Sequence, residues 1–364
     1  MKQELFVTCP RGLEDLLHAE LSQLGLSVRK GVSGVYLPRT MHSVYLVNYC
    51  SRIAIRVLWP MFNFRCPHKE ALYRGAREID WTELLNLEKT FSIDANVVHP
   101  TLNNSLFASL VVKDAICDTL RETFGERPSV NTKNPDVQLN LYIFNGFATI
   151  SLDTSGAPLY KRGWREQTGE APIQESLAAA LLALSEYTDE ESLCDPFCGS
   201  GTILVEAAMM ATKTPPGFFR ENWGFTNHPG FSQDDWKSVK QAANEKRIPL
   251  AEGKIFGADK DPESVAMCKM HLEKLGCADV IDLQRRGINS YSPFPTPSLI
   301  VTNPPYGKRL HTSLEYFRAL GELAKKTRTC LLAPDSSFIQ ATGRPIQQSF
   351  PLVSGGLKLS LFHI

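Results

Sequence analysis

Two short segments carry residues whose types and spacing could do chemistry. "CDPFCGSGT" (194–202) places a carboxylate, Asp195, directly before the glycine turn Gly199-Ser200-Gly201, and "NPPY" (303–306) directly follows an apolar run. Glycines in such a turn tolerate positive φ and let a ligand approach the backbone, while the start of the next helix offers unpaired N–H groups. Both segments therefore predict ligand contacts at the ends of buried strands.

The first segment differs from a dinucleotide-binding turn, which needs a third glycine and an acid about 20 residues later. Leu204 stands where that glycine would be, and the next strand-ending acid, Asp259, comes far later. Asp195 would repel a diphosphate and attract a cation, while Asp259 could accept ribose hydroxyls. S-adenosyl-L-methionine, a nucleoside with an amino group and a sulfonium, fits both acids. The alternative is structural, with Asp195 as a turn former and Asp259 as a helix-flanking acid.

The second segment could hold an amine. Pro304 and Pro305 have no N–H, so the strand stops and the Pro304 carbonyl is held rigidly. The amine of a nucleobase is a poor nucleophile, and two acceptors, the Asn303 side-chain oxygen and the Pro304 carbonyl, could bind its hydrogens and aim its lone pair at a methyl group. Tyr306 could stack on an extruded base. The alternative is a rigid loop with an aromatic plug.

The elements that position these residues alternate between strand and helix from residue 172 onward, which predicts a parallel α/β sheet. Strands "SLCDP", "KIFGAD" and "SLIVTN" would bring the three polar residues to one edge. We expect a helix over 172–187 with Pro172 at its first position, and another capped by Asp261 and ended by Gly276.

The front of the chain has a different pattern. Residues 1–47 predict strand, helix, strand, strand and helix, and residues 48–158 a second mixed unit with a long helix ending at Gly125 and a hairpin turning at Asn145-Gly146. A polar connector over 159–171 leads to the third unit, 172–364.

Composition restricts the protein class. The chain has 364 residues, zero formal net charge and nine cysteines without a C-x-x-C pair. This predicts free thiols in a reducing cytoplasm, with neither a disulfide framework nor a metal site. No apolar run approaches the roughly 18 residues of a membrane span.

Segment 51–77 concentrates positive charge among aromatic residues, with Glu70 as its single acid. Such a segment suits a phosphate backbone and unstacked bases, although a solvated face over an aromatic core is an equal alternative. Its candidate RNA contacts are Arg52, Arg56, Arg65, Lys69, Arg74 and Arg77.

Several blocks resemble a known family. "DPFCGSGT" with "NPPYGKRL" is similar to the paired signature of class I amino-group methyltransferases. "LYKRGWREQTGEAPIQESLAAALL", "ISLDTSG" and "TPPGFFRENWGFTNHPGF" resemble the THUMP-domain RNA guanine-N2 methyltransferases, which include bacterial large-subunit rRNA enzymes. The resemblance implies a C-terminal Rossmann-like domain, with a mostly parallel seven-stranded sheet and an antiparallel last strand. It also implies preceding α+β ferredoxin-like and THUMP domains.

The resemblance also implies residue roles. Asn303, Pro304, Pro305 and Tyr306 would hold the target amine and base, residues 1–158 would hold RNA, and Lys308 and Arg309 would touch the target backbone. Cofactor contacts would come from Asp195, Pro196, Phe197, Cys198, Gly199, Ser200, Gly201, Thr202 and Asp259.

Two departures from the family pattern stand out. Gly287 occupies the place of an acid that many relatives use to bind the adenine amine, with Asn289 as the candidate substitute. Some relatives also fuse a second methyltransferase unit, so a single reaction is expected here.

We therefore expect S-adenosyl-L-methionine-dependent methylation of guanine N2 in structured RNA, with 23S rRNA as the first candidate and tRNA as the second. Adenine-N6 methylation of RNA or DNA stays open, because the same acceptors can hold either amine. Glutamine methylation on a protein, or a non-catalytic RNA-binding factor, are further alternatives.

Overall fold

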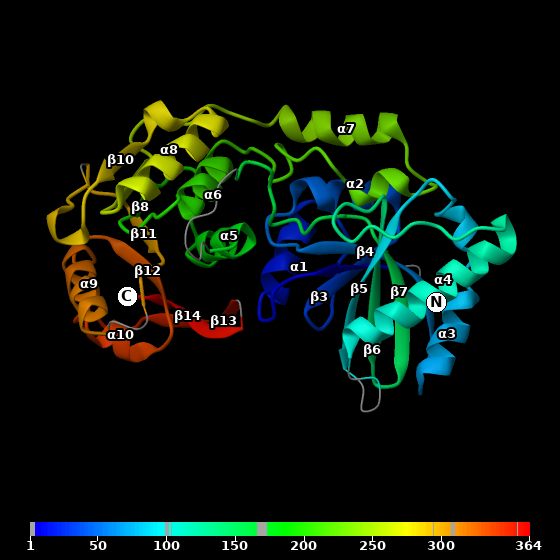
Figure 1. Ribbon diagram of the computed structural model, residues 1–364. Helices are drawn as coiled ribbons and strands as arrows, with labels where there is room; N and C mark the ends of the chain where they lie inside the picture. The colour runs from blue at the N-terminus through cyan, green and yellow to red at the C-terminus, as the bar shows by residue number, and fades with distance from the viewer. Residues whose placement is uncertain are drawn as a thin grey trace.

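The computed structural model describes residues 4–98, 102, 104–165, 173–293, 295–306, 310–354 and 356–364. Two seven-stranded sheets organise the chain, one in the N-terminal half and one in the C-terminal half. Figure 1 shows them side by side, with the C-terminal sheet and its helices on the left. No helix within the described ranges is both long and apolar enough to cross a membrane.

The N-terminal sheet joins the first two predicted units. Its strands are β1 (Glu4–Thr8), β2 (Arg29–Lys30), β3 (Gly34–Pro38), β4 (Arg56–Arg65), β5 (Phe91–Val98), β6 (Val137–Phe144) and β7 (Phe147–Asp153), in the order β2-β3-β1-β4-β7-β6-β5. β4 pairs antiparallel with β1 on one side and with β7 on the other. The units 1–47 and 48–158 are therefore two halves of one continuous sheet.

Helices α1 (Glu14–Gln23), α2 (Met41–Cys50), α3 (Lys69–Arg77) and α4 (Ser105–Phe124), with the 3-10 turn η1 (Trp81–Glu83), belong to this half. α4 ends at Gly125, whose φ of 81° is the left-handed conformation that its position predicted. The hairpin between β6 and β7 turns at Asn145 and Gly146, both with positive φ, as the sequence also predicted.

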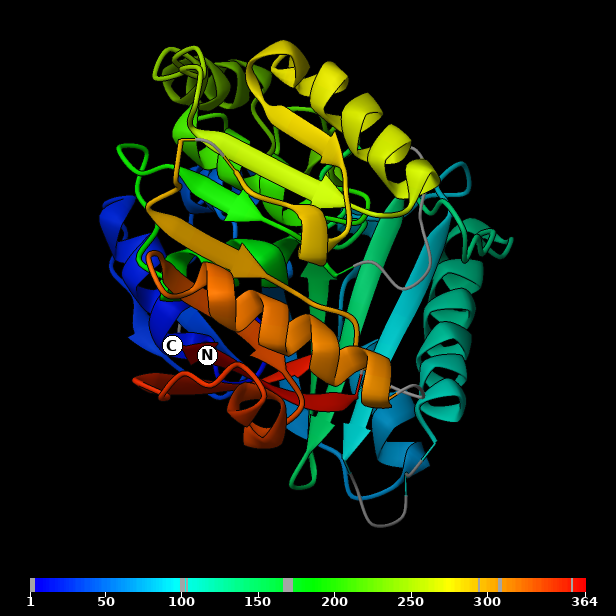
Figure 2. The same ribbon diagram turned by 90° about the vertical axis from the view of Figure 1, so that its left-hand side faces the viewer.

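The C-terminal sheet has the predicted mostly parallel arrangement. Its strands are β8 (Leu193–Asp195), β9 (Ile255–Asp259), β10 (Asp282–Arg285), β11 (Leu299–Thr302), β12 (Arg328–Ala333), β13 (Gln348–Ser354) and β14 (Leu357–His363), in the order β10-β9-β8-β11-β12-β14-β13. The first five in that order are parallel, and β14 runs antiparallel to both neighbours. In Figure 2 the green to orange arrowheads of this sheet point to one side, where a site is expected.

The helices of this half are α5 (Glu175–Leu184), α6 (Thr202–Ala211), α7 (Gln233–Asn244), α8 (Pro262–Leu275), α9 (Leu310–Leu323) and α10 (Ser336–Gln340), with 3-10 turns η2 (Gly224–Asn227), η3 (Ala278–Val280) and η4 (Ile288–Ser290). α8 has the predicted Asp261 cap, which accepts from two backbone N–H groups, and ends at Gly276. α5 begins at Glu175, later than predicted, and Pro172 lies outside the described residues.

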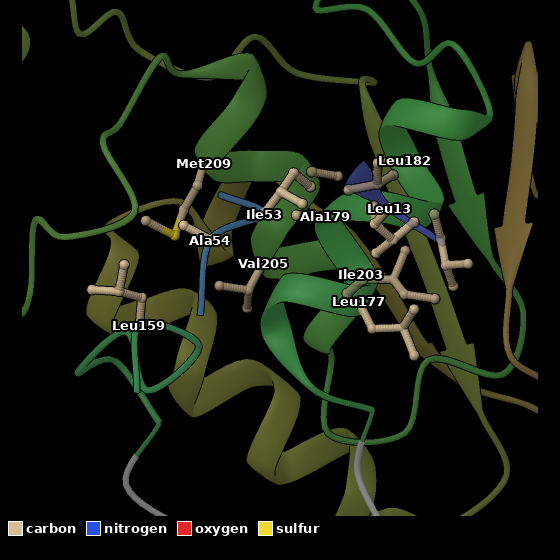
Figure 3. Packing of buried hydrophobic residues seen from close by; sticks show 14 of the residues in the cluster. Leu13, Ile53, Ala54, Leu159, Leu177, Ala179, Leu182, Ile203, Val205 and Met209 are labelled. Atoms are coloured by element: carbon tan, nitrogen blue, oxygen red, sulfur yellow. The ribbon is translucent and has the colours of Figure 1, made fainter. Parts of the chain in front are cut away.

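One hydrophobic core spans both halves. Figure 3 shows buried side chains of the N-terminal half packed against α5 and α6: Leu13, Ile53, Ala54 and Leu159 against Leu177, Ala179, Leu182, Ile203, Val205 and Met209. The first part of the predicted linker belongs to this core, because Leu159, Arg162 and Trp164 are buried. Residues 159–165 are therefore a packed joint between the halves.

Candidate active site

The ends of β8, β9 and β11 bring the predicted polar residues together. Thr302, the last residue of β11, donates its hydroxyl to Asp195 Oδ1 at 2.6 Å. On the other side of β8, the backbone N–H of Gly199 donates to Asp259 Oδ2 at 3.0 Å. Asn303 follows Thr302 directly, so all three predicted residues lie at one edge of the sheet, as parallel strands require.

The glycine turn has the backbone conformation that its sequence predicted. Gly199 and Gly201 have φ values of 52° and 85°, in the left-handed region that favours glycine. A Cβ on Gly201 would lie 2.4 Å from Cys268 Sγ of α8, whereas a Cβ on Gly199 would meet nothing within 4 Å. Gly201 therefore permits helix packing, while Gly199 leaves open space over the turn where a ligand could approach.

Asp195 is a buried carboxyl group whose pKa is raised into the neutral range. Burial first, and the neighbouring Asp259 carboxylate less strongly, raise the pKa of Asp195 to about 7. Within the described residues, both hydrogen bonds that it accepts, from Thr302 and from the Phe197 backbone, go to Oδ1. The Oδ2 atom is thus left for a cationic group, which would favour the ionised form.

Asp259 is half-exposed, and its orientation is fixed by the backbone. Oδ2 accepts from Gly199 N, and Oδ1 accepts from Asp261 N at 2.9 Å. A carboxylate has about four lone-pair sites, so two N–H donors leave room for two further donors. The vicinal hydroxyls of a ribose would match this need, and the contact of Asp259 with the cofactor stays a prediction.

Asn303 presents an acceptor that has no partner within the described ranges. Its side-chain Oδ1 is buried and accepts no hydrogen bond from the described part of the chain. A buried acceptor left unpaired costs about 1–3 kcal/mol, so this position fits an incoming donor such as an amine. Pro304 is buried and Pro305 exposed, while Tyr306 is half-buried against the hydrophobic core. Lys308 and Arg309 lie outside the described residues.

Arg165, which the sequence analysis missed, supports the glycine turn. Its Nε donates to Glu175 Oε1 at 2.8 Å, Nη1 donates to Ser200 Oγ at 3.2 Å and Nη2 donates to Thr202 Oγ1 at 2.7 Å. The guanidinium also lies 4.8 Å from the ring centre of Trp164. Its one sequence signal was its place in the family-like block "LYKRGWREQTGEAP".

The remaining wall residues are less engaged. Cys194 and Cys198 are buried, and burial raises the pKa of the Cys194 thiol well above its ordinary value, so it is a neutral wall residue. Asn289 is exposed in η4, just beyond β10. Arg285, the last residue of β10, lies opposite Asp259 in the strand register. Gly287 would place a Cβ 3.8 Å from that of Lys260. A contact of Asn289 with the cofactor stays a prediction.

Two of the predicted RNA contacts are contradicted by their surroundings. Arg52 Nη2 donates to the carbonyls of Met209 and Thr214, at 3.1 and 2.8 Å, between the two halves of the protein. Arg56 forms an ion pair with buried Asp153 and donates to the carbonyl of Gly156 at 2.8 Å. Both guanidinium groups are used to hold the chain together, because their backbone partners would otherwise be unsatisfied.

The other basic residues of segment 51–77 lie closer to solvent. Arg77 is half-exposed and pairs with Glu122 of α4. Arg65, Lys69 and Arg74 are exposed, and Lys69 Nζ lies 3.9 Å from Glu70 Oε1, which is a loose ion pair. These three side chains are available for phosphate contacts.

The strand order, the acid-tipped β8, the glycine turn and the polar end of β11 together define a class I methyltransferase fold. Comparison with known families agrees. Residues 162–340 match the family described as "RMKL-like, methyltransferase domain", residues 68–153 match the THUMP domain, and residues 4–58 match the "RlmL ferredoxin-like domain".

Named relatives show the same combination. The chain is 33% identical, over 97% of its length, to the ribosomal RNA large subunit methyltransferase K/L of Shewanella frigidimarina, of which it covers 51%. The solved structure of SMU.472, a methyltransferase complexed with SAH, covers 100% of this chain at 27% identity with a TM-score of 0.87; 98% of that chain is covered. A protein of Listeria monocytogenes described as an N6-adenine-specific DNA methylase has 25% identity and a TM-score of 0.86, over 99% of this chain and 95% of that one.

The chain therefore carries an RMKL-like methyltransferase domain, preceded by an RlmL ferredoxin-like domain and a THUMP domain. It spans about half the length of the curated relatives that it matches.

Proposed function

We propose that this protein transfers a methyl group from S-adenosyl-L-methionine to the exocyclic N2 amine of a guanine in structured RNA, with 23S rRNA as the first candidate. The observation that carries the proposal is the buried Oδ1 of Asn303, which accepts no hydrogen bond from any described residue and lies at the same sheet edge as Asp195. Asn303 directly follows Thr302, whose hydroxyl donates to Asp195. An acceptor for the amine therefore lies close to an acid that can bind a cation, and N-methylation needs both.

The residues present fit this cofactor. Asp195 Oδ2 would accept from its amino group, Asp259 would accept from its ribose hydroxyls, and the N–H groups at the start of α6 face the turn. Bound there, the cofactor supplies an electrophilic methyl group. Arg165 holds the hydroxyls of Ser200 and Thr202 and so fixes the shape of the turn before any ligand arrives.

The residues after β11 would bind and orient the target amine. Asn303 Oδ1 and the Pro304 carbonyl accept its two hydrogens, which turns its lone pair out of conjugation and favours positive charge on the nitrogen. Tyr306 would stack on the base, whose removal from its helix costs a few kcal/mol. Thr302 couples this acceptor pair to the cofactor acid through its bond to Asp195.

The N-terminal half would hold the RNA. The exposed Arg65, Lys69 and Arg74 are the described residues that fit phosphate contacts, and Lys308 and Arg309 are proposed as contacts with the target backbone. The name of the Shewanella frigidimarina relative supports rRNA as the substrate, with tRNA as the second candidate. All nine cysteines are free, which supports a place of action in the reducing cytoplasm.

Adenine-N6 methylation is the second candidate function. The same two acceptors would hold an adenine amine, and the name of the Listeria monocytogenes protein favours it. Glutamine methylation on a protein would leave the THUMP domain without a role. A non-catalytic factor would have no use for a buried Asn303 oxygen that finds no donor in the described part of the chain.

The decisive experiment incubates total RNA from cells lacking this protein with the purified protein and isotope-labelled S-adenosyl-L-methionine. The RNA is then digested to nucleosides and analysed by mass. Labelled N2-methylguanosine is the expected product. Labelled N6-methyladenosine would replace guanine by adenine as the substrate, and an absence of label in RNA would refute the proposal.

A further inference from the structure

The sheet of the THUMP domain exposes aromatic rings next to its hairpin. On β6 and β7, near the turn at Asn145-Gly146, Phe147 is 51% exposed, Phe144 45% and Tyr142 43%. Val98 at the end of β5 is 56% exposed. Soluble proteins seldom expose contiguous apolar side chains on this scale without a partner, so the patch indicates a binding surface.

The strand register places these side chains in two parallel rows across four strands. In the first row Val98 pairs with Phe144, Phe144 with Phe147, and Phe147 with Arg65. In the second row Asn96 pairs with Tyr142, Tyr142 with Thr149, and Thr149 with Asn63. Residues paired across strands or two apart along a strand point to the same face. We call these eight residues the aromatic face.

The helices of the domain cover the opposite face of the sheet. The alternate residues of β6 and β7, such as Leu141 and Ile150, are fully buried in one cluster with Val112 and Ile116 of α4. Figure 2 shows α4 running along one side of these strands. Within the described residues, the aromatic face therefore has solvent rather than a helix in front of it.

We propose that the aromatic face binds unpaired RNA nucleotides by stacking. The Tyr142 and Phe144 rings have centres 6.1 Å apart and planes only 13° apart, so they present like-oriented surfaces to neighbouring bases of one strand. Base–aromatic stacking is tolerant of sequence and suits single strands. This proposal rests on the proposed function, which requires the protein to hold RNA.

The polar members of the face favour nucleic acid over an apolar protein partner. Arg65 offers a guanidinium for a phosphate or a base, and Asn96 is an exposed amide that can recognise a base edge. Asn63 Nδ2 already donates to Thr149 Oγ1 at 2.8 Å, so Asn63 contributes its side-chain oxygen as an acceptor. None of the eight residues is acidic, so no carboxylate on the face would repel a phosphate. Asp94, an acid two residues before Asn96 on β5, is paired with Arg56 at 3.4 Å.

The face continues toward the catalytic domain. Further along β7 on the same side, Ser151 and Asp153 are buried beneath the chain that leads to the catalytic domain. Arg220, from the segment between the glycine turn and β9, donates to the carbonyl of Ser155 there at 2.5 Å. An RNA strand stacked on the aromatic face would thus lie on the side of the sheet where the catalytic domain attaches.

The test compares two double variants of the full-length protein. Phe144→Leu/Phe147→Leu removes two rings of the face, and Phe107→Leu/Phe124→Leu removes two rings of similar exposure, 43% and 40%, from α4. Binding to a fluorescein-labelled oligouridine and to a labelled RNA duplex of equal length is measured by fluorescence anisotropy. S-adenosyl-L-methionine binding and the melting temperature of each variant are measured to show that it is folded.

We expect the face variant to bind the single strand about tenfold or more weakly, with the duplex and the cofactor bound as before, because stacking is lost and phosphate contacts are kept. The α4 variant should bind like the parent protein. Equal affinities of the two variants, or a face variant that changes the oligomeric state without changing RNA binding, would overturn the proposal. Failure of the proposed function would look different, as absent methyl transfer with intact, ring-dependent binding of the single strand.

Discussion

At the scale of single residues, the candidate active site contains groups that the described part of the fold leaves incompletely satisfied. Asp195 is buried with a pKa raised to about 7, and Asn303 Oδ1 is buried with no donor among the residues that the structure describes. Each would be a loss of stability in a protein with no ligand. Each becomes favourable when a cation or an amine arrives, which explains why both occur at the same sheet edge.

Cofactor binding should therefore depend on pH through Asp195. A cation binds the ionised carboxylate, and ionisation rises through a pKa of about 7, so affinity for S-adenosyl-L-methionine should rise about tenfold from pH 6 to pH 8. Titration calorimetry at both pH values measures this change. Asp195→Asn should bind weakly with no such slope, and a parent protein without a slope would contradict the assignment.

The same shift affects stability with a definite sign. The folded protein keeps the Asp195 proton up to about pH 7, whereas the unfolded chain loses it near the ordinary value of 3.8. This group therefore makes the ligand-free protein less stable as the pH rises across that window.

Asn303→Ala should separate chemistry from cofactor binding. The variant loses the acceptor that orients the amine, so kcat should fall about a thousandfold or more while the Kd for the cofactor stays within twofold. Single-turnover transfer of labelled methyl to RNA measures the first quantity, and Gln241→Ala serves as a control at an exposed residue of α7. Near-normal turnover of Asn303→Ala would remove the residue from the mechanism.

At the scale of elements, the site depends on how three strands and the connector before α5 meet. The glycine turn is fixed by the positive φ of its glycines and by Arg165, which joins Glu175 of α5 to the hydroxyls at the start of α6. The connector thus acts on the turn from outside the sheet. Arg165 can support the turn in this way because its planar guanidinium group carries several N–H donors in a fixed geometry.

Replacing Arg165 should weaken cofactor binding more than turnover. Arg165→Lys keeps the charge but cannot donate to three partners at once, so KM for S-adenosyl-L-methionine should rise about tenfold with kcat changed less than threefold. Steady-state kinetics at varied cofactor concentration test this. Arg285→Lys, at the exposed end of β10, is the matched control, and an equal effect there would argue against a positioning role.

The exposed basic residues of α3 and the end of β4 should set the salt dependence of RNA binding. Replacing Arg65, Lys69 and Arg74 together with alanine should lower the slope of log affinity against log salt by about 2, since each lost single-strand phosphate contact contributes about 0.7. Lys237 and Lys246, exposed on and after α7, provide a control pair. An unchanged slope would favour the solvated-face interpretation of segment 51–77.

At the scale of the whole molecule, the two halves are joined by charge as well as by apolar packing. Arg162 Nε donates to Glu206 Oε1 at 3.1 Å, with both side chains almost fully buried, and Arg162 Nη2 donates to the carbonyl of Arg52 at 2.6 Å. Glu206 lies on α6, the helix that follows the glycine turn. The joint between the halves therefore contacts the same helix as the cofactor site.

Glu206→Gln should destabilise the protein strongly. Glu206 also lies 4.0 Å from Arg52, measured from Oε2 to Nη1, so the variant leaves both Arg162 and Arg52 without their carboxylate. This costs about 3–5 kcal/mol in the free energy of unfolding. Urea denaturation measures the loss. Glu191→Gln breaks a half-exposed pair with Arg328 at 2.8 Å and should cost less than about 1 kcal/mol. Equal losses in the two variants would show that the joint is unimportant for stability.

The sequence predicted features that depend on local residues and missed those that depend on distant pairing. The Asp261 cap, the Gly125 and Gly276 helix ends and the Asn145-Gly146 turn follow from a few adjacent residues, and the structure confirms them. Arg52 looked like a surface cation because nothing near it in sequence shows that Thr214 would cover it. The shared sheet was missed for the same reason, since the pairing of β4 with β1 joins residues far apart in the chain.

The continuous N-terminal sheet has a geometric consequence. β4 connects the two parts of that sheet, β2-β3-β1 and β7-β6-β5, and the packed joint at residues 159–165 holds the sheet against α5 and α6. The ends of β6 and β7 therefore lie at a fixed distance from Asn303. In the proposed function, the target nucleotide would be selected mainly by its distance from the RNA segment bound at the ends of β6 and β7, and less by the sequence around it. An RNA whose helix is one turn too long would therefore present the wrong base.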